Sequence, residues 1–325
     1  MNILVTGGAG YIGSVCVDEL LSRGRQVVVV DNLQEGHRKA VDPDAVLYEG
    51  NCGDRKLLNE IFARHSIDAV MHFAADTVVE KSMTDPGRFF RNNVVNGIAL
   101  LDTMMEFGCR RMIFSSTAST FGEPQYNPVD EQHPQTPINP YGESKLMFER
   151  ILDWYHRAHG LKCISLRYFN AAGATRQRGD AKKNVTLIIP VIIEFLLGKR
   201  DKFFIFGNDY PTKDGTCIRD YIHIADLVKA HILALEHIDT YPNNKYNLGN
   251  GKGFSNLEVV QAMEKATGKP VPYEIAPRRP GDPVVLVASS ERARSELGWQ
   301  PAHTSLEEIV ASAWEWHRKH PDGYE

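Results

Sequence analysis

The glycine-rich stretch after the first apolar run constrains the fold most. In "NILVTGGAGYIGS" a β-branched run at 2–6 leads into Gly7, Gly10 and Gly13, and apolar residues at helical spacing follow over 13–23. The first glycine permits a tight turn, the second lets backbone approach a pyrophosphate, and the third lets helix and strand pack closely. This order predicts a dinucleotide-binding unit with a phosphate at the helix N-terminus.

Asp31 strengthens this interpretation because it ends the next apolar run, "QVVVV" at 26–30. A carboxylate there can accept hydrogen bonds from the adenosine ribose and would repel a 2′-phosphate, which favours NAD over NADP. The alternative is a glycine turn that binds nothing, with Asp31 as a solvated strand end. The strand before the glycines, the helix after them and the acidic residue downstream favour the nucleotide site.

The first half of the chain alternates strand and helix patterns. Further buried strands are expected at 45–49, 68–73, 111–116 and 163–169, and helices at 55–65, 88–107 and 141–159. Strands that alternate with helices predict a parallel sheet covered on both faces, and right-handed crossovers make it doubly wound. The expected fold class is therefore α/β, with a Rossmann-like sheet.

The second half is less regular and predicts a smaller α/β substrate domain. Helical patterns recur at 225–237, 255–267 and 305–319, between turn-rich connections. We expect residues 1–175 to form the NAD-binding domain, to which the chain returns near 223–250, and residues 176–325 to form mainly the substrate domain.

Composition excludes several classes of function. The net charge of −4 over 325 residues argues against a nucleic-acid partner, which usually contacts a basic surface. The five cysteines are odd in number and none form a CxxC pair, so we expect neither a disulfide framework nor a metal site. With no signal-peptide pattern and no stretch long enough to span a bilayer, we expect a cytoplasmic protein that does not enter a membrane.

Tyr141 and Lys145 in "NPYGESKLMFER" form the candidate catalytic pair. Asn139 can cap a helix and Pro140 suits its first position, so the two side chains become neighbours one turn apart. A nearby ammonium and a positively charged nicotinamide ring both favour the phenolate, and we expect them to lower the pKa of Tyr141 toward the working range of a general base. The alternative is a packed tyrosine beside a solvated lysine.

Two other stretches bear on this pair. "FSSTAS" at 114–119 ends the fifth predicted strand at the same crevice, and Thr117 is the candidate to hydrogen-bond the reacting oxygen, although such runs are often local turn chemistry. A second Tyr-x-x-x-Lys, from Tyr241 to Lys245, runs through Pro242 and two asparagines, so we expect a turn there.

The chain resembles the extended short-chain dehydrogenase/reductase family and, within it, the UDP-glucose (UDP-galactose) 4-epimerases. The stretches that carry the resemblance run from one end of the chain to the other: "VTGGAGYIGS", "DNL", "HFAA", "NNVVNG", "FSSTAS", "PYGESK", "RYFNAAGA", "IFGNDYPTKDGTCIRDYIH", "YNLGNGKG", "RRPGD", "ELGW" and "HPDGY". Several of them are typical of the sugar-nucleotide branch.

The resemblance implies a role for each matching position. The catalytic residues would be Thr117, Tyr141 and Lys145. The residues that bind a tightly held NAD would be Gly7, Gly10, Tyr11, Ile12, Gly13, Asp31, Asn32, Asn51, Cys52, Phe73, Ala74, Ala75, Asn92, Ser115, Tyr141, Lys145 and Tyr168. Those that bind a UDP-sugar would be Thr117, Asn170, Phe204, Ile205, Phe206, Arg219, Tyr221, Arg279, Asp282 and Leu286.

The implied reaction is the interconversion of UDP-galactose and UDP-glucose. NAD would oxidise C4 to a 4-keto intermediate with Tyr141 as base, and the sugar would turn over before it is reduced from the other face. Arginines suit the diphosphate for a physical reason, because their planar fork binds phosphate oxygens well, although an isolated arginine usually forms a surface ion pair.

Two rival functions are weighed against this reaction. Sugar-nucleotide 4,6-dehydratases resemble the chain but carry Asp-Glu after the strand-end threonine, where this chain has Ala118 and Ser119. A binding protein that senses NAD without catalysis would be expected to lack the pair formed by Tyr141 and Lys145.

Some positions depart from the family pattern. Asn51, Thr77, Phe121 and Leu187 replace residues that are common in relatives, which puts single contacts in doubt. Leu286 stands where the family lines the pocket beside the C2 substituent of the sugar, and its intermediate size leaves open a weaker activity on UDP-N-acetylhexosamines. The resemblance also implies a homodimer, with the helices near 88–107 and 141–159 at its interface.

Overall fold

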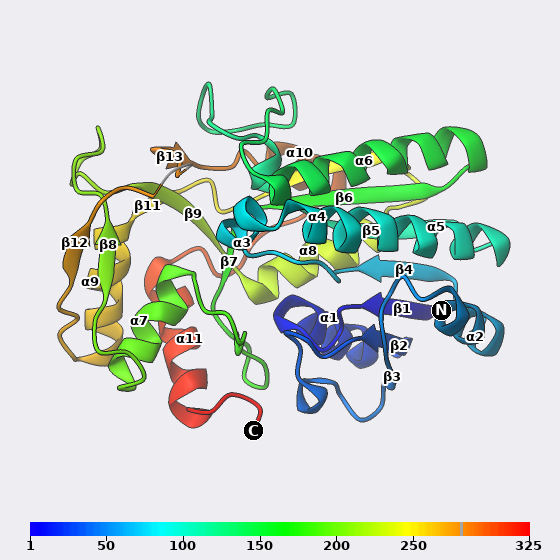
Figure 1. Cartoon of the computed structure of the whole chain (residues 1–325), viewed down its shortest axis with the longest axis horizontal. Helices are drawn as coiled ribbons and strands as arrows, with labels where there is room; N and C mark the ends of the chain where they lie inside the picture. The colour runs from blue at the N-terminus through cyan, green and yellow to red at the C-terminus, as the bar shows by residue number, and fades with distance from the viewer. Residues whose placement is uncertain (280–281) are drawn as a thin grey trace.

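A seven-stranded parallel sheet forms the centre of the computed structural model, which describes residues 1–279 and 282–325 (Figure 1). The strand order is β10-β6-β5-β4-β1-β2-β3. The bounds are β1 (Asn2–Thr6), β2 (Gln26–Asp31), β3 (Val46–Glu49), β4 (Ala69–His72), β5 (Arg111–Thr117), β6 (Lys162–Tyr168) and β10 (Asn244–Leu248). The six strands expected in the first half are confirmed to within one or two residues at each end.

Helices cover both faces of this sheet because the strands are apolar on both faces. Ile3 and Val5 of β1 face α1 (Tyr11–Ser22), α8 (Ile224–Glu236) and α10 (Glu291–Leu297). Leu4, between them, faces α2 (Arg55–His65), α5 (Asn96–Glu106) and α6 (Pro140–His159). This alternation is the period-two geometry of a strand buried on both faces. The doubly wound fold predicted from the sequence is therefore confirmed.

The helical pattern at 88–107 contains a local irregularity. The structure has α3 (Val79–Thr84) and α4 (Pro86–Phe90), then a π-helical turn at Arg91–Val95 that continues into α5. Within this turn, Asn93 accepts a hydrogen bond from the Asp76 amide at 2.8 Å and donates to Ser144 of α6 at 3.0 Å. The turn thereby ties α6 to the segment after β4, and π-helical turns of this kind often lie at functional sites.

The second lobe contains two small sheets and three helices, on the left in Figure 1. β9 (Ile218–His223) pairs with β7 (Asn170–Ala172), β11 (Gly253–Ser255) and β13 (Val285–Leu286), and β8 (Phe204–Phe206) pairs with β12 (Glu274–Ala276). α7 (Ile188–Leu196), α9 (Asn256–Thr267) and α11 (Leu306–Lys319) share one apolar core with these strands. Short 3-10 turns at Arg38–Ala40 and Ala118–Thr120 complete the described elements.

The chain crosses between the lobes more than once. β7 lies in the second lobe although it follows β6 directly, while α8 and β10 belong to the central sheet and its helical layer. We propose the division into residues 1–175, with a return near 223–250, and residues 176–325 as a description of two functional units.

Candidate active site

The glycine turn between β1 and α1 allows the protein backbone to come close to a bound ligand. Gly7 has a φ of +73°, which disfavours any side chain, and a Cβ on it would lie 2.7 Å from the amide nitrogen of Ala74. A Cβ on Gly13 would lie 2.2 Å from the Gly7 carbonyl oxygen, so helix and strand can pack this closely only with glycine. Gly10 is the N-cap residue of α1 and has no side chain to block the free amides. These features fit a pyrophosphate.

Asp31 lies beside this turn at the end of β2. Its carboxylate accepts hydrogen bonds from the amides of Ala9 at 3.0 Å and Leu33 at 2.9 Å, and the residue is 8% exposed. Burial raises the pKa of Asp31, and the two amides act against that shift. Each carboxylate oxygen keeps a lone pair that can accept a ribose hydroxyl.

A single cleft, called the main cleft below, joins this turn to the candidate catalytic residues. Its lining includes the predicted cofactor residues Gly7, Gly10, Tyr11, Ile12, Gly13, Asp31, Asn32, Asn51, Cys52, Phe73, Ala74, Ala75, Asn92, Tyr141 and Tyr168. Thr117 and Asn170, predicted to touch substrate, line the same cleft. Ser115 and Lys145 lie just behind the lining, since Lys145 Nζ donates to the Ser115 carbonyl at 2.9 Å and the Ser115 hydroxyl bonds to that of Tyr168.

The start of α6 positions the tyrosine and the lysine. The Asn139 side chain accepts a hydrogen bond from the Gly142 amide at 2.8 Å, and Pro140 is the first helical residue, as the sequence predicted. Tyr141 and Lys145 are 9% and 3% exposed on the buried side of the helix. Thr117, the last residue of β5, lies within hydrogen-bonding reach of the Tyr141 phenol.

The electrostatics of this pair differ from the expectation for the protein by itself. Burial raises the pKa of Tyr141, opposed by the hydrogen bond with Thr117, whereas the sequence argument predicted a lower value. Burial also lowers the pKa of Lys145 to about 7, although Cys52 and Glu149 act to raise it. The prediction counted the charges of Lys145 and of a bound nicotinamide ring and omitted the cost of burying both side chains, so its direction is wrong for the protein without the ring.

The second Tyr-x-x-x-Lys is not a site, as its turn residues predicted. Asn243 has a φ of +60° between Tyr241 and Lys245, and Lys245 belongs to β10. The ammonium of Lys245 pairs with Asp153 at 2.7 Å.

The other residues predicted to bind substrate gather in the second lobe, next to the cleft. Asn170 lies opposite Tyr221 where β7 pairs with β9, and Arg219 lies opposite Leu286 where β9 pairs with β13. Arg219 is also 3.7 Å from the carboxylate of Asp282. These strands therefore form a continuous path from the main cleft to the arginines.

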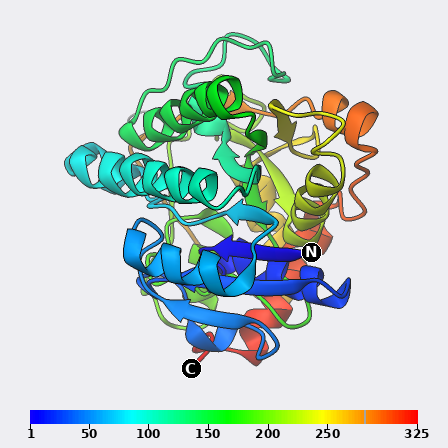
Figure 2. The ribbon, with the colours of Figure 1, turned by 90° about the vertical axis from the view of Figure 1, so that its right-hand side faces the viewer.

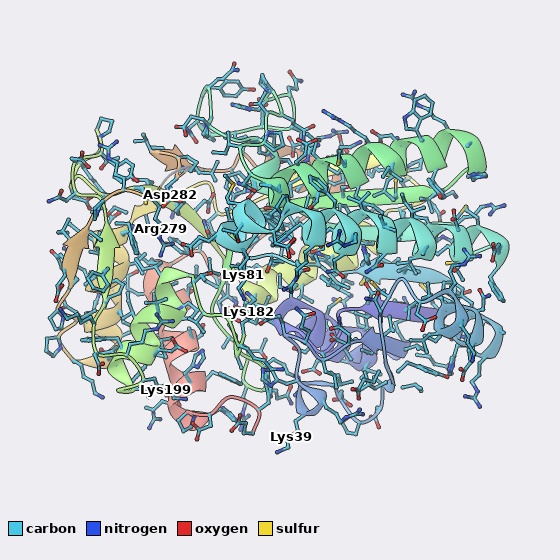
Figure 3. All side chains as sticks on the ribbon, in the orientation of Figure 1. Lys39, Lys81, Lys182, Lys199, Arg279 and Asp282 are labelled. Carbon is cyan, nitrogen blue, oxygen red and sulfur yellow. The ribbon has the colours of Figure 1, made fainter. Side chains whose placement is uncertain are left out.

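Arg279 and the strand β8 form the far end of this path (Figure 3). The Arg279 guanidinium lies 3.8 Å from the ring centroid of Phe206, and it is 3.6 Å from Glu80 of α3. Phe204 is exposed, whereas Ile205 as a whole is 1% exposed in the core. Neither its side chain nor its backbone is open to a ligand, so the structure does not support the predicted contact of Ile205 with the substrate. Pro280 and Gly281 of the "RRPGD" motif lie outside the described residues.

The sequence analysis missed one part of the cleft lining. Residues 179–182 and 184–186, together with Lys81 and Tyr324, also line the main cleft, next to Leu187, which the sequence analysis named only as a departure from the family pattern. The only local signal was "DAKKN", two adjacent lysines in a turn-rich segment.

Two other classes of site are absent from the part of the chain that the structure describes. Within residues 1–279 and 282–325, no three or more His, Cys, Asp or Glu side chains gather as a metal site would require. None of the helices formed by these residues combines the length and the apolarity needed to cross a bilayer.

Comparisons with known proteins agree on one family. The model of the NAD dependent epimerase/dehydratase family matches residues 3–249. The UDP-glucose 4-epimerase of Lacticaseibacillus casei is 49% identical, over 100% of this chain and 99% of that protein. The crystal structure of UDP-glucose 4-epimerase from Bifidobacterium longum in complex with NAD+ and UDP is 37% identical, with a TM-score of 0.94 over 99% of this chain and 100% of that one. That of the UDP-Glc/GlcNAc 4-epimerase from Campylobacter jejuni is 43% identical, with a TM-score of 0.86 over 98% of this chain and 99% of that one.

Proposed function

The chain belongs to the NAD dependent epimerase/dehydratase family, and from that premise we propose that it is a UDP-glucose 4-epimerase that interconverts UDP-galactose and UDP-glucose with bound NAD. The observation that carries this proposal is the main cleft, which joins the glycine turn, the buried Tyr141 and Thr117, and Asn170 at the start of the path to the arginines. A nucleotide cofactor and a nucleotide sugar can meet there at one carbon atom.

The residues of the cleft fit NAD. The glycine turn leaves the amides at the start of α1 free for a pyrophosphate, and Asp31 can accept a ribose hydroxyl. When bound, the nicotinamide ring supplies a reversible acceptor for the hydride on C4 of the hexose. The Lys145 ammonium, which donates to the Ser115 carbonyl in this structure, would hydrogen-bond the ribose of the nicotinamide.

Tyr141 is the proposed general base and acid. It takes the proton of the C4 hydroxyl as that carbon is oxidised to the 4-ketose and returns the proton when the ketone is reduced on its other face. Thr117 hydrogen-bonds the C4 oxygen, a role supported by its contact with the phenol. All three catalytic side chains are buried, which limits their direct contact with bulk water.

The second lobe holds the UDP group. Arg219 and Arg279 supply charge to the diphosphate, and Phe206, already stacked on Arg279, forms a wall for the uracil. Anchoring at UDP lets the hexose turn over between the two half-reactions without leaving the cleft, which uses binding energy remote from the reacting carbon.

The scope for N-acetylated sugars depends on Leu286. Leu286 packs against a buried apolar cluster that contains Phe169, which lines the main cleft, and Ala118, the neighbour of Thr117. Its side chain is therefore close to the position of the sugar. We propose that UDP-N-acetylglucosamine is accepted, more weakly than UDP-glucose, because misfit at an apolar wall gives graded discrimination.

Two rival functions make different predictions in one assay. A 4,6-dehydratase needs an acid and base next to the threonine, and here Ala118 is buried in an apolar cluster. Incubation of the purified protein with UDP-galactose should yield UDP-glucose, measured by chromatography. A 4-keto-6-deoxy product would indicate a dehydratase, and bound NAD without turnover would indicate a sensor.

We propose that the protein is a homodimer in the cytoplasm. Trp154 and Met147 on α6, seven residues apart on one face, are 65% and 40% exposed, and Val95, the N-cap residue of α5, is 57% exposed. α5 and α6 are neighbours in Figures 1 and 2. This apolar surface supports a homodimer whose four helices form one bundle. The five free, buried cysteines suit a reducing cytoplasm.

A further inference from the structure

The segment at residues 178–184, called the strap below, crosses from the second lobe to the nucleotide end of the main cleft. Four of its residues, Gly179 to Lys182, and also Asn184, line the cleft together with the loop at 34–37. Figure 3 labels Lys182 between α1 and α7, where the two lobes meet. The strap therefore covers the end of the cleft that holds Asp31 and the glycine turn.

Polar contacts tie the strap to the loop after β2. His37 Nε2 lies 2.7 Å from the Ala181 carbonyl, and Lys183 Nζ donates to the carbonyls of Leu33 and Gln34 at 3.0 and 3.1 Å. These contacts hold the strap directly over the residues that follow Asp31. They are exchangeable with water, so residues 181–184 can lift away while Gly179 stays packed on the Trp316 ring.

Asn184 and Arg178 anchor the two ends of the strap. The Asn184 side chain donates to Glu35 and accepts a hydrogen bond from Lys81 Nζ at 2.6 Å. Arg178 pairs with Asp18 of α1 at 2.9 Å, with both side chains largely buried and both outside the lining of the cleft. The N-terminal end of the strap is thus held by an ion pair outside the cleft, which a ligand in the cleft would not contact.

Lys182 carries the charge of the strap into the cleft. Its Nζ lies 5.3 Å from the ring centroid of Tyr11, the first residue of α1, and 3.3 Å from Asp180. The free amides of α1 begin at this residue, and a pyrophosphate bound to them would come within reach of the lysine. Another cation in the lining, Arg88, is already held by Asp76 through two hydrogen bonds of 2.6 and 3.0 Å.

We propose that the strap retains the dinucleotide cofactor, with Lys182 as a ligand of its pyrophosphate and the pair of Arg178 and Asp18 as the anchor. The proposal rests on the proposed function, because it takes NAD as the occupant of the main cleft. It explains how a cofactor that is regenerated in every turnover stays on the protein between turnovers. Release requires the strap contacts to break first.

The test measures the exchange of NAD on the holoenzyme. Protein purified with its NAD is incubated with an excess of deuterium-labelled NAD, separated by gel filtration at intervals, and the bound cofactor is measured by mass. Lys182→Met should exchange about tenfold faster than wild type, because a charge-assisted hydrogen bond contributes roughly that factor or more to affinity. Lys182→Arg should restore slow exchange, since it keeps the charge.

The anchor is tested separately with Asp18→Asn, which alters no residue of the cleft lining. It should also speed exchange several-fold, while the control Arg176→Met, an exposed cation two residues before the anchor, should exchange at the wild-type rate. Thermal unfolding of each variant shows that the fold is retained. Wild-type exchange rates in Lys182→Met or in Asp18→Asn would overturn the proposal. Wild-type protein that is purified without NAD and binds none would instead overturn the proposed cofactor.

Discussion

The buried ion pair of Glu149 and Arg167 should make the stability of the catalytic region sensitive to the loss of either partner. Arg167 donates to the two carboxylate oxygens of Glu149 at 2.9 and 2.6 Å, and the side chains are 2% and 1% exposed. The Ser116 hydroxyl donates to the same carboxylate. Glu149 lies one turn after Lys145, Ser116 precedes Thr117 and Arg167 precedes Tyr168, so the pair joins the three elements that carry the catalytic residues.

Arg167→Met should unfold far more easily than wild type, because it leaves the Glu149 carboxylate buried without its partner. Breaking a buried pair in this way costs about 3–5 kcal/mol, which is a large part of the roughly 5–15 kcal/mol that stabilises a typical domain. The double variant Glu149→Leu and Arg167→Met removes both charges of the pair. We expect its free energy of unfolding to return close to that of wild type. About 1 kcal/mol should remain lost because the Ser116 hydroxyl no longer has its acceptor.

Urea denaturation followed by the fluorescence of the four tryptophans measures these free energies. The NAD content of each sample must be matched, because a ligand that binds only the folded state adds to its apparent stability. Two results would refute the argument that the unpaired buried carboxylate causes the loss of stability. One is a decrease of less than about 1 kcal/mol in the free energy of unfolding of Arg167→Met. The other is a double variant that is as unstable as the single one.

The other predictions concern activity and assembly. Tyr141→Phe should retain NAD and lose about 100- to 10,000-fold in turnover of UDP-galactose, as expected when a general base is removed; turnover within threefold of wild type would contradict its role. Arg219→Ala and Arg279→Ala should each weaken UDP binding by roughly 1.5–3 kcal/mol and leave NAD binding intact, as measured by calorimetry. Equal losses of affinity for UDP and NAD would show that these arginines do not belong to a separate UDP site. Leu286→Tyr should lower the ratio of kcat/KM for UDP-N-acetylglucosamine to that for UDP-glucose, by a factor equivalent to roughly 1–3 kcal/mol. An unchanged ratio would show that Leu286 does not control which sugar is accepted. Trp154→Arg should shift the mass in light scattering from dimer to monomer, and the dimer interface lies elsewhere if it does not.

Local sequence patterns predicted the site residues correctly where a short stretch of chain determines its own geometry. The glycine turn needs only its neighbouring strand and helix to be identified, because Gly7 and Gly13 face backbone within the same βα unit or the adjacent strand end. Tyr141 and Lys145 share a helix face once Asn139 and Pro140 start that helix. For these residues the short-range pattern and the final environment agree.

Other features depend on contacts between distant parts of the chain, and no local pattern reports them. The strap lies over the cleft because His37 and Lys183 meet segments more than a hundred residues away in sequence. The orientation of Ile205 depends on which face of β8 packs on the core, and a three-residue strand shows too short an alternation to predict that. The raised pKa of Tyr141 likewise reflects burial, which follows from the whole fold.

The raised pKa of Tyr141 also affects how this residue would act as a base. Burial disfavours the charged form of both groups, so it raises the pKa of Tyr141 and lowers that of Lys145 to about 7. In the protein by itself, the phenol is therefore held neutral, and the lysine alone is insufficient to ionise it. A positively charged ring beside Tyr141 would favour the phenolate by direct attraction, whereas an uncharged, reduced ring would not. The same buried tyrosine can thus give up its proton or hold it according to the charge next to it, which is the alternation that a reaction with an oxidative and a reductive half requires.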